Sequence, residues 1–239
     1  GDYLYFSTPY ADTVVKEGSD QQEHNFKLTD FFSVKLDGTN WSKIYSTTND
    51  SDSLQFSFVK TASQNDVNLA VYDGSKLVVI NCSTKTQSVV SQNVTAVAMP
   101  KVSAYKHSNN QISMAESQIY YTRSKLETES NKGNVLAYTV IGENTENIIL
   151  RDDTTYTLKS ASKDALVVSF QAKDDTNACN RFIALNSNGE PQTDINVIAN
   201  QKLDKSGVSD LLLFGFEEGN PVGVVVKNGD NKLAFIPYG

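Results

Sequence analysis

The sequence contains few of the residues on which most catalytic and metal sites depend. Its 239 residues include two histidines, two cysteines and one tryptophan. His24 and His107 both fall in polar segments that we expect to be loops, so neither has the rigid frame that a catalytic triad needs. No GxSxG elbow, GxGxxG loop or Walker loop occurs, and no His or Cys spacing fits zinc. We therefore expect no catalytic residue, no cofactor and no bound metal.

Long apolar runs and basic stripes are also missing. No stretch approaches the ~18 apolar residues that span a bilayer, so we expect no membrane insertion of this segment. The net charge is −7, and the acidic residues are dispersed along the chain. Nucleic-acid phosphates require clustered Lys and Arg, so we expect no nucleic-acid partner.

The two cysteines, Cys82 and Cys179, lie far apart in the sequence. They form a disulfide if the protein folds in an oxidising compartment, or they are two buried thiols in the core. The sequence leaves both alternatives open.

Short strands separated by turn residues dominate the pattern that is present. Residues 54–58, LQFSF, alternate apolar and polar side chains, which is typical of a strand with one buried face. Residues 77–80, LVVI, are wholly apolar and indicate a strand buried on both faces. Asp-Gly pairs at 37–38 and 73–74 supply tight turns, and no window has a helical stripe. The sequence therefore predicts an all-β fold.

The predicted strands group into modules of four. Residues 31–40, FFSVKLDGTN, match 135–144, VLAYTVIGEN, with Gly38 opposite Gly142 and Asn40 opposite Asn144. Tyrosine-rich strands precede both copies, a third copy occurs at 181–191, and a fourth, looser copy occurs at 77–85. In chain order the predicted strands are 3–7, 31–36, 43–46; 54–59, 69–73, 77–81, 88–90; 94–99, 119–122, 135–141, 147–150; 156–161, 166–171, 181–186, 195–198; and 211–216, 222–227, 233–236.

Repeated modules of this size predict a β-propeller, in which small twisted sheets bury both faces by stacking on one another. We expect a single domain over 1–239, built from about five four-stranded blades or forming an arc of a larger propeller. The chain begins and ends inside a module. Either its first and last strands pair to close a ring, or the chain is an arc of a larger propeller.

Three polar segments interrupt the modules, at 9–30, 101–117 and 123–134. The first and third occupy the same place, between the second and third strands of their modules. We expect them to be loops that emerge on one face, where long loops often bind partners.

The segments YLYFS at 3–7 and FFSVKLDGTNWSKIY at 31–45 carry a resemblance. They resemble the repeats of secreted or lipid-anchored bacterial β-propeller domains of unknown function, and blades of the TolB and prolyl peptidase propellers. The resemblance is good at 3–46, partial at 119–150 and weak elsewhere. It implies a propeller at an extracytoplasmic location and transfers no catalytic residue.

Two functions from different classes fit these observations. The first is a non-enzymatic binding or scaffolding module with a protein or glycan partner. Its candidate binding surface is an aromatic set in which tyrosines offer an apolar face and a polar tip. Packing between blades is the alternative role for these side chains. They are Tyr3, Tyr5, Tyr10, Trp41, Tyr120 and Tyr121.

The second function is a glycan-active enzyme, which needs two or three acids that converge on one pocket. The candidate acids stand near strand ends, where Asp commonly bonds to the local backbone instead. They are Asp30, Asp66, Asp152, Asp153, Asp174 and Glu217. The sequence favours the non-enzymatic function.

Overall fold

A computed structural model describes residues 2–15, 23–47, 53–60, 66–99, 117–129, 133–152, 155–161, 165–171, 179–184, 208–217, 220–228 and 233–237. Regular secondary structure in these ranges is β-strand, which confirms the all-β prediction. The ranges contain no helix with the length and hydropathy of a membrane span.

The described strands form five antiparallel sheets. The first sheet contains β1 (Tyr3–Val15), β2 (Glu23–Lys35) and β3 (Ser42–Ser46). The second contains β4 (Gln55–Lys60), β5 (Val67–Tyr72), β6 (Leu77–Asn81) and β7 (Gln87–Ser91). The third contains β8 (Val94–Ala98), β9 (Gln118–Arg123), β10 (Asn134–Val140) and β11 (Asn147–Asp152). The fourth contains β12 (Thr155–Ala161), β13 (Ala165–Gln171) and β14 (Cys179–Ala184), and the fifth β15 (Val208–Glu217), β16 (Asn220–Asn228) and β17 (Leu233–Pro237).

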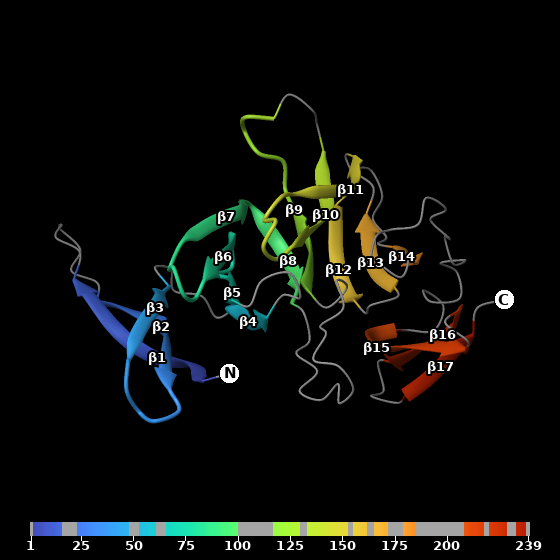
Figure 1. Ribbon diagram of the computed structural model, residues 1–239. Coiled ribbons are helices and arrows are strands. Elements are labelled where there is room, and N and C mark those ends of the chain that lie inside the picture. The colour runs from blue at the N-terminus through green and yellow to red at the C-terminus, as the bar shows by residue number, and fades with distance from the viewer. Residues whose placement is uncertain are drawn as a thin grey trace.

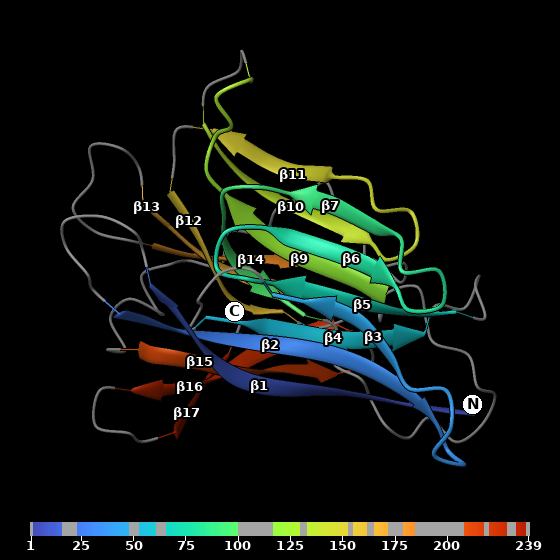
Figure 2. The same cartoon turned by 90° about the vertical axis from the view of Figure 1, so that its left-hand side faces the viewer.

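Each sheet is a meander in which consecutive strands pair with one another. The sheets follow one another across Figure 1 in chain order, with the first and fifth at the two ends. In Figure 2 the first sheet faces the viewer and the second and third lie behind it. A succession of small antiparallel meanders packed face to face is a β-propeller-type architecture, as the sequence predicts.

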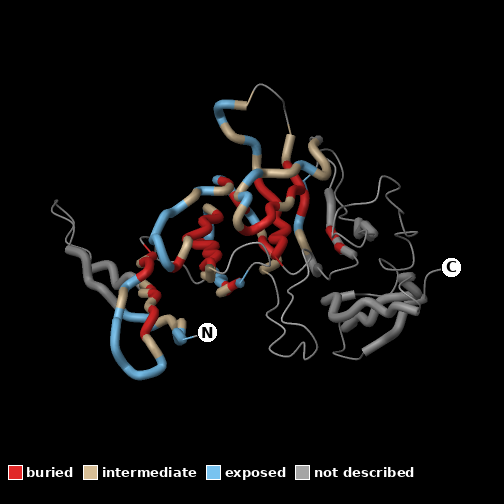
Figure 3. Tube along the Cα trace, in the orientation of Figure 1, coloured by how far each residue is buried: buried red, intermediate tan, exposed pale blue. Residues whose placement is uncertain are grey.

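The core lies between successive sheets, where Figure 3 shows the buried residues. Phe31 of the first sheet packs with Leu69 and Ile80 of the second. The opposite face of the second sheet packs on the third, and the third on the fourth. The cluster between the second and third sheets includes Ala70, Val79, Ile119, Tyr121 and Ala137. The cluster between the third and fourth sheets includes Tyr120, Leu136, Tyr156 and Leu166. Alternate residues of one strand therefore face different neighbours, as the two-residue period requires.

One backbone hydrogen bond recurs in the first three sheets and fixes which positions are equivalent. The amide after the third strand of the module donates to a carbonyl at the start of the second strand. The bonds are Leu36 N to Asp2 O, Cys82 N to Val67 O, and Ile141 N to Ser117 O, each 2.9 Å long. Residues at equal distances from these anchors occupy equivalent places in the three sheets.

The turns that follow these anchors contain the matched residues of the repeat. Gly38 and Asn40 have φ of 82° and 55°, and Gly142 and Asn144 have φ of 102° and 55°. All four occupy the region that glycine and asparagine tolerate best, so their prediction as turn residues is confirmed. Counted from Leu36 and Ile141, however, the two turns are one residue out of step.

The expected strands are confirmed wherever the structure describes them, with bounds that shift by at most a few residues outside the first hairpin. The prediction of a loop over 9–30 is wrong. β1 continues to Val15 and β2 begins at Glu23, and the two pair from Tyr3 with Lys35 to Val15 with Glu23. Paired strands satisfy the backbone of a polar segment as well as solvent does, so polarity alone does not indicate a loop. Residues 101–116 and the strand expected at 195–198 lie outside the described residues.

Cys82 is a free, buried thiol, so a disulfide between Cys82 and Cys179 is not formed. Cys82 belongs to the core between the first and second sheets. Burial raises the pKa of the Cys82 thiol to about 12, with a smaller contribution from the negative charge of Asp66. This cysteine is a core residue of the interface between two sheets.

Candidate functional site

The structure divides the aromatic set that the sequence singles out. Tyr120 and Tyr121 are buried in β9 and face different neighbours, so the expectation that they join an exposed surface is wrong. Successive residues of a strand point to opposite faces, and the third sheet is covered on both. Tyr3, Tyr10 and Trp41 are exposed.

Trp41 belongs to an aromatic group on the face of the first sheet that points away from the second. The Phe6 and Phe32 rings stack with centroids 5.6 Å apart, and Trp41 packs edge-on against Phe6 at 5.5 Å. The indole Nε1 of Trp41 donates to the carbonyl of Gly38 at 3.1 Å, which joins the ring to the turn. The Nζ atom of Lys43 lies over the Phe32 ring, 5.8 Å from its centroid. We call this surface, with Leu4 and Leu36, the outer face.

The outer face is apolar and open. Leu36 is 72% exposed, Trp41 65% and Leu4 53%. The residues equivalent to Leu4 in the next two sheets are Leu69 and Ile119, and both are fully buried under the preceding sheet. The outer face thus has the composition of a covered sheet face, whereas no described core cluster includes its exposed residues.

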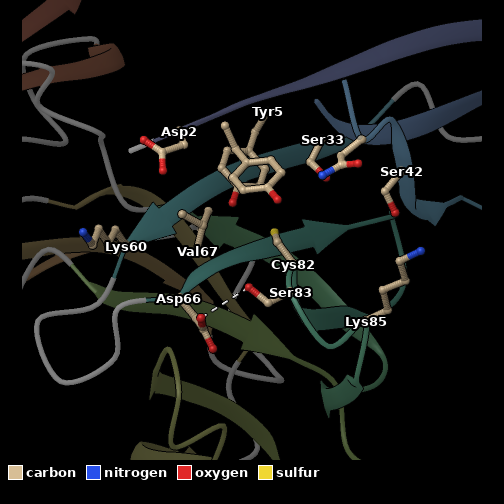
Figure 4. A pocket seen from close by; sticks show the side chains of 12 residues that line it. Asp2, Tyr5, Ser33, Ser42, Lys60, Asp66, Val67, Cys82, Ser83 and Lys85 are labelled. Atoms are coloured by element: carbon tan, nitrogen blue, oxygen red, sulfur yellow. Dashed lines mark hydrogen bonds between the residues drawn. The ribbon is translucent and has the colours of Figure 1, made fainter. Parts of the chain in front are cut away.

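A second candidate is a cleft of about 770 Å³ between the first and second sheets. Figure 4 shows Asp2, Tyr5 and Ser33 on one wall, and Val67, Cys82 and Ser83 on the other. Both walls contribute polar and apolar groups. The lining residues are Asp2, Tyr3, Tyr5, Ser33, Asn40, Ser42, Lys60, Asp66, Val67, Cys82, Ser83 and Lys85.

Neutral donors hold the carboxylate of Asp66 in this cleft. Asn81 Nδ2 donates to Asp66 Oδ2 at 3.2 Å, and Ser83 Oγ donates to Asp66 Oδ1 at 3.3 Å. Lys60 and Lys85 form no ion pair with any residue of the described ranges. Burial raises the pKa of Tyr5, with smaller contributions from Cys82, Tyr3 and Asp66, so its phenol stays a neutral donor.

A third candidate is a buried ion-pair network at the end of β9. The guanidinium of Arg123, 2% exposed, donates to Glu129 at 2.7 and 2.9 Å and to Glu146 at 2.7 and 2.9 Å. Tyr121 Oη and Ser91 Oγ also donate to Glu146, at 2.8 and 3.3 Å. Arg151 donates to Glu129 at 2.8 Å.

The pKa shifts of the acids in this network indicate a structural role. Hydrogen bonds from Arg123 hold the pKa of Glu129 well below its usual range. Burial would raise the pKa of Glu146, but hydrogen bonds from Arg123 and Tyr121 outweigh burial and lower it. Both acids therefore remain ionised and paired, and neither is poised to transfer a proton.

The network also changes the interpretation of the loop expected at 123–134. Arg123 is the last residue of β9, and Glu129 accepts a hydrogen bond from Leu126 N at 3.0 Å as well as those from Arg123. Residues 124–129 are therefore fastened to the third sheet by a buried arginine. The sequence offers no signal for this, because the partners are 6 and 23 residues apart and belong to no motif.

The acids proposed for an enzyme do not converge in the described residues. Asp30 pairs with Lys43 at 2.6 Å, and Asp66 lies in the cleft on the other side of the first sheet. Asp152 and Glu217 lie in β11 and β15 with only their backbone described, and Asp153 and Asp174 lie outside the described residues.

The histidines and metal sites give no further candidate. His24 lies in β2, not in the loop that the sequence predicts, and its side chain is not described. His107 lies outside the described residues. Within the described part of the chain, no three His, Cys, Asp or Glu side chains gather as a metal site.

The sequence matches no protein-family model and no curated protein. The chain is similar to several solved structures. One is TolB from Acinetobacter baumannii, with 10% identity and a TM-score of 0.36 over 88% of this chain and 49% of TolB. Others are an oligogalacturonate lyase in complex with manganese (10% identity, TM-score 0.38, 96% of this chain and 73% of the lyase) and Pyrococcus horikoshii acylaminoacyl peptidase (8%, 0.32, 100% and 45%). The chain spans about half the length of the TolB structure. At these identities the fold assignment rests on the strand order given above. The chain is a β-propeller-type protein, and its function follows from its own surfaces.

Proposed function

We propose that this chain, as a single unit over 1–239, is a non-enzymatic propeller-type binding module that docks a protein partner on the outer face of its first sheet. The observation that carries the proposal is the exposure of Leu4 and Leu36, whose equivalents in the next two sheets are buried. Those equivalents are Leu69 and Cys82 in the second sheet, and Ile119 and Ile141 in the third. Contiguous exposed apolar surface of this kind marks interaction sites.

The proposed partner surface is itself an apolar β-sheet face. Each of the first three sheets packs on its successor through alternate aliphatic and aromatic residues, and the outer face continues that series by one step. Aromatic anchors such as Trp41 dominate the energetics of interfaces, and the Asp30–Lys43 pair supplies polar specificity near Phe32.

The repeat resemblance at 3–46 supports an extracytoplasmic location for this module. The same segments, YLYFS and KLDG, lie in the first sheet and its turn, so the resembling part of the chain is the part that contains the outer face. A scaffold for protein partners at the cell surface is consistent with that location.

The test uses the purified chain as bait and two double variants. Leu36→Ser with Trp41→Ser removes the exposed apolar groups of the outer face. Val89→Ser with Ile148→Ser removes two exposed apolar groups from other sheets and is the matched control. Loss of a hot spot of ~2 kcal/mol weakens Kd about 30-fold, so we expect at least that effect from the first pair and none from the second.

The measurement is a titration of the purified partner that the bait captures, with circular dichroism to confirm that both variants fold. Equal capture by both variants would contradict the proposal. Concentration-dependent dimerisation of the chain that disappears in the outer-face variant would replace the protein partner with a second copy.

A further inference from the structure

The cleft between the first and second sheets is separate from the outer face, because its residues lie on the opposite side of the first sheet. Its volume of about 770 Å³ falls in the range of ~300–1,000 Å³ that small-molecule sites occupy. Its two walls come from different sheets, so a ligand in it contacts both (Figure 4).

The apolar part of the cleft is built from tyrosine rings. Tyr3 and Tyr5 have centroids 6.4 Å apart and planes tilted by 38°, and Tyr5 is braced by Phe58 at 5.5 Å. A braced ring presents a fixed apolar face with a hydroxyl at its tip. The C–H face of a sugar ring is the apolar part of an otherwise polar ligand, and it suits such a platform.

The polar part of the cleft suits hydroxyl groups. Asn40 provides an amide, and Ser33, Ser42 and Ser83 provide hydroxyls that both donate and accept. The carboxylate of Asp66 has about four acceptor sites, of which Asn81 and Ser83 use two, so hydroxyl donors of a ligand have acceptors available.

The charge of the cleft is balanced. Two acids, Asp2 and Asp66, stand against two lysines, Lys60 and Lys85, which leaves no net charge. In Figure 4 the two lysines lie toward opposite sides of the view, with the Tyr5 ring and Asp66 between them. A balanced lining favours a neutral ligand over a strongly anionic or cationic one.

From these groups we propose that the cleft between the first and second sheets binds a neutral carbohydrate, with Tyr3 and Tyr5 against the sugar ring and Asp66 and Asn40 on its hydroxyls. The site does not depend on the proposed protein partner, because the two surfaces share no side chain. It gives the chain a second recognition function for a small polyhydroxylated ligand.

The test is calorimetric titration of the purified chain with maltotriose, cellotriose and chitotriose. A triuronate and an extended Thr-Val hexapeptide serve as the anionic and peptide comparators. We expect at least one neutral trisaccharide to bind with a Kd that is insensitive to salt. Binding of none of the three at millimolar concentration would overturn the proposal. Preference for the triuronate that fades with salt, or for the peptide, would overturn it as well.

The variants Tyr3→Ala and Tyr10→Ala form a matched pair on one strand. The two rings are 42% and 39% exposed, but only Tyr3 lines the cleft. We expect Tyr3→Ala to weaken Kd about tenfold and Tyr10→Ala to leave it unchanged. Equal effects would place the sugar elsewhere.

The variant Asn40→Gly tests the polar wall without straining the turn. Asn40 has a φ of 55°, and glycine adopts that conformation readily, so the variant removes only the amide side chain. We expect a severalfold weaker Kd with the wild-type thermal midpoint. An unchanged Kd in both Asn40→Gly and Tyr3→Ala would contradict the proposal.

Discussion

Arg123 holds Glu146 in a bidentate ion pair, with Nε 2.9 Å from Oε2 and Nη2 2.7 Å from Oε1. The arginine ends β9, and the glutamate follows the turn after β10, so the pair ties that turn to the second strand of the third sheet. Ser91, at the end of β7, donates to the same carboxylate, which extends the tie to the second sheet.

We expect Arg123→Met to lower the free energy of unfolding by about 3–5 kcal/mol, because it leaves two carboxylates without their buried partner. Arg151→Met is the control. Arg151 is 19% exposed and, among the described residues, pairs with Glu129 alone, so its loss should cost about 1 kcal/mol or less. Urea denaturation at pH 7 measures both. Equal losses of stability in the two variants would show that Arg123 contributes no more to the network than Arg151 does.

The same network predicts an acid-sensitive stability. The folded state lowers the pKa of Glu146 and of Glu129, so the stabilisation is fully present above the ordinary glutamate pKa of about 4.3 and is lost as pH falls below it. Glu146→Gln should therefore be less stable than the unsubstituted protein at pH 7. It should also lose less stability than that protein between about pH 5 and about pH 3, the range in which an ordinary glutamate titrates. The exposed Glu127→Gln is the control. A wild-type pH profile in Glu146→Gln would contradict this account.

Cys82 should resist thiol reagents in the folded protein. Burial raises its pKa to about 12, and the residue is only 6% exposed although it lines the cleft. At pH 8, about the usual labelling pH, little thiolate is therefore present and little of the residue is accessible. In a Cys179→Ser background, we expect labelling only as fast as the sheets open, and immediate labelling in denaturant. The raised pKa also predicts that stability falls as pH rises above the ordinary thiol value of 9.0. Rapid native labelling would place Cys82 at the surface.

Asn144 tests the turn of the repeat. Its φ is 55° and its Oδ1 accepts from Gly142 N at 3.2 Å. A β-branched residue in this conformation is strained, so Asn144→Val should cost about 1–2 kcal/mol, whereas Asn144→Gly should cost less. Thr145→Val, at the next and exposed position, is the control. Thermal unfolding of the three variants measures these costs and tests whether position 144 requires the left-handed backbone conformation.

The strand positions were predictable from sequence because local patterns determine them. The alternation at 54–58 and the apolar run at 77–80 each indicate a strand without knowledge of its partner. The same local logic failed at 9–30, where polar residues form two long paired strands. Polar residues occur in strands as well as in loops, so polarity alone does not distinguish a polar hairpin from a loop.

The candidate sites were predictable only in part. Trp41 and Tyr3 stand out by residue type, and they are exposed. The burial of Tyr121 and its bond to Glu146 depend on the third sheet packing on the second, which is a long-range relationship. The cleft likewise joins Tyr5 to Asp66 across two sheets, and no spacing in the sequence brings them together.

The central claim is that the outer face of the first sheet is a docking surface for a protein partner. The most direct measurement compares partner affinity for the unsubstituted chain, the Leu36→Ser/Trp41→Ser variant and the Val89→Ser/Ile148→Ser variant, with each partner purified before titration. The account predicts a Kd about 30-fold weaker for the first variant and unchanged for the second. Equal affinity in all three chains would contradict it, because a partner indifferent to Leu36 and Trp41 does not dock on the outer face.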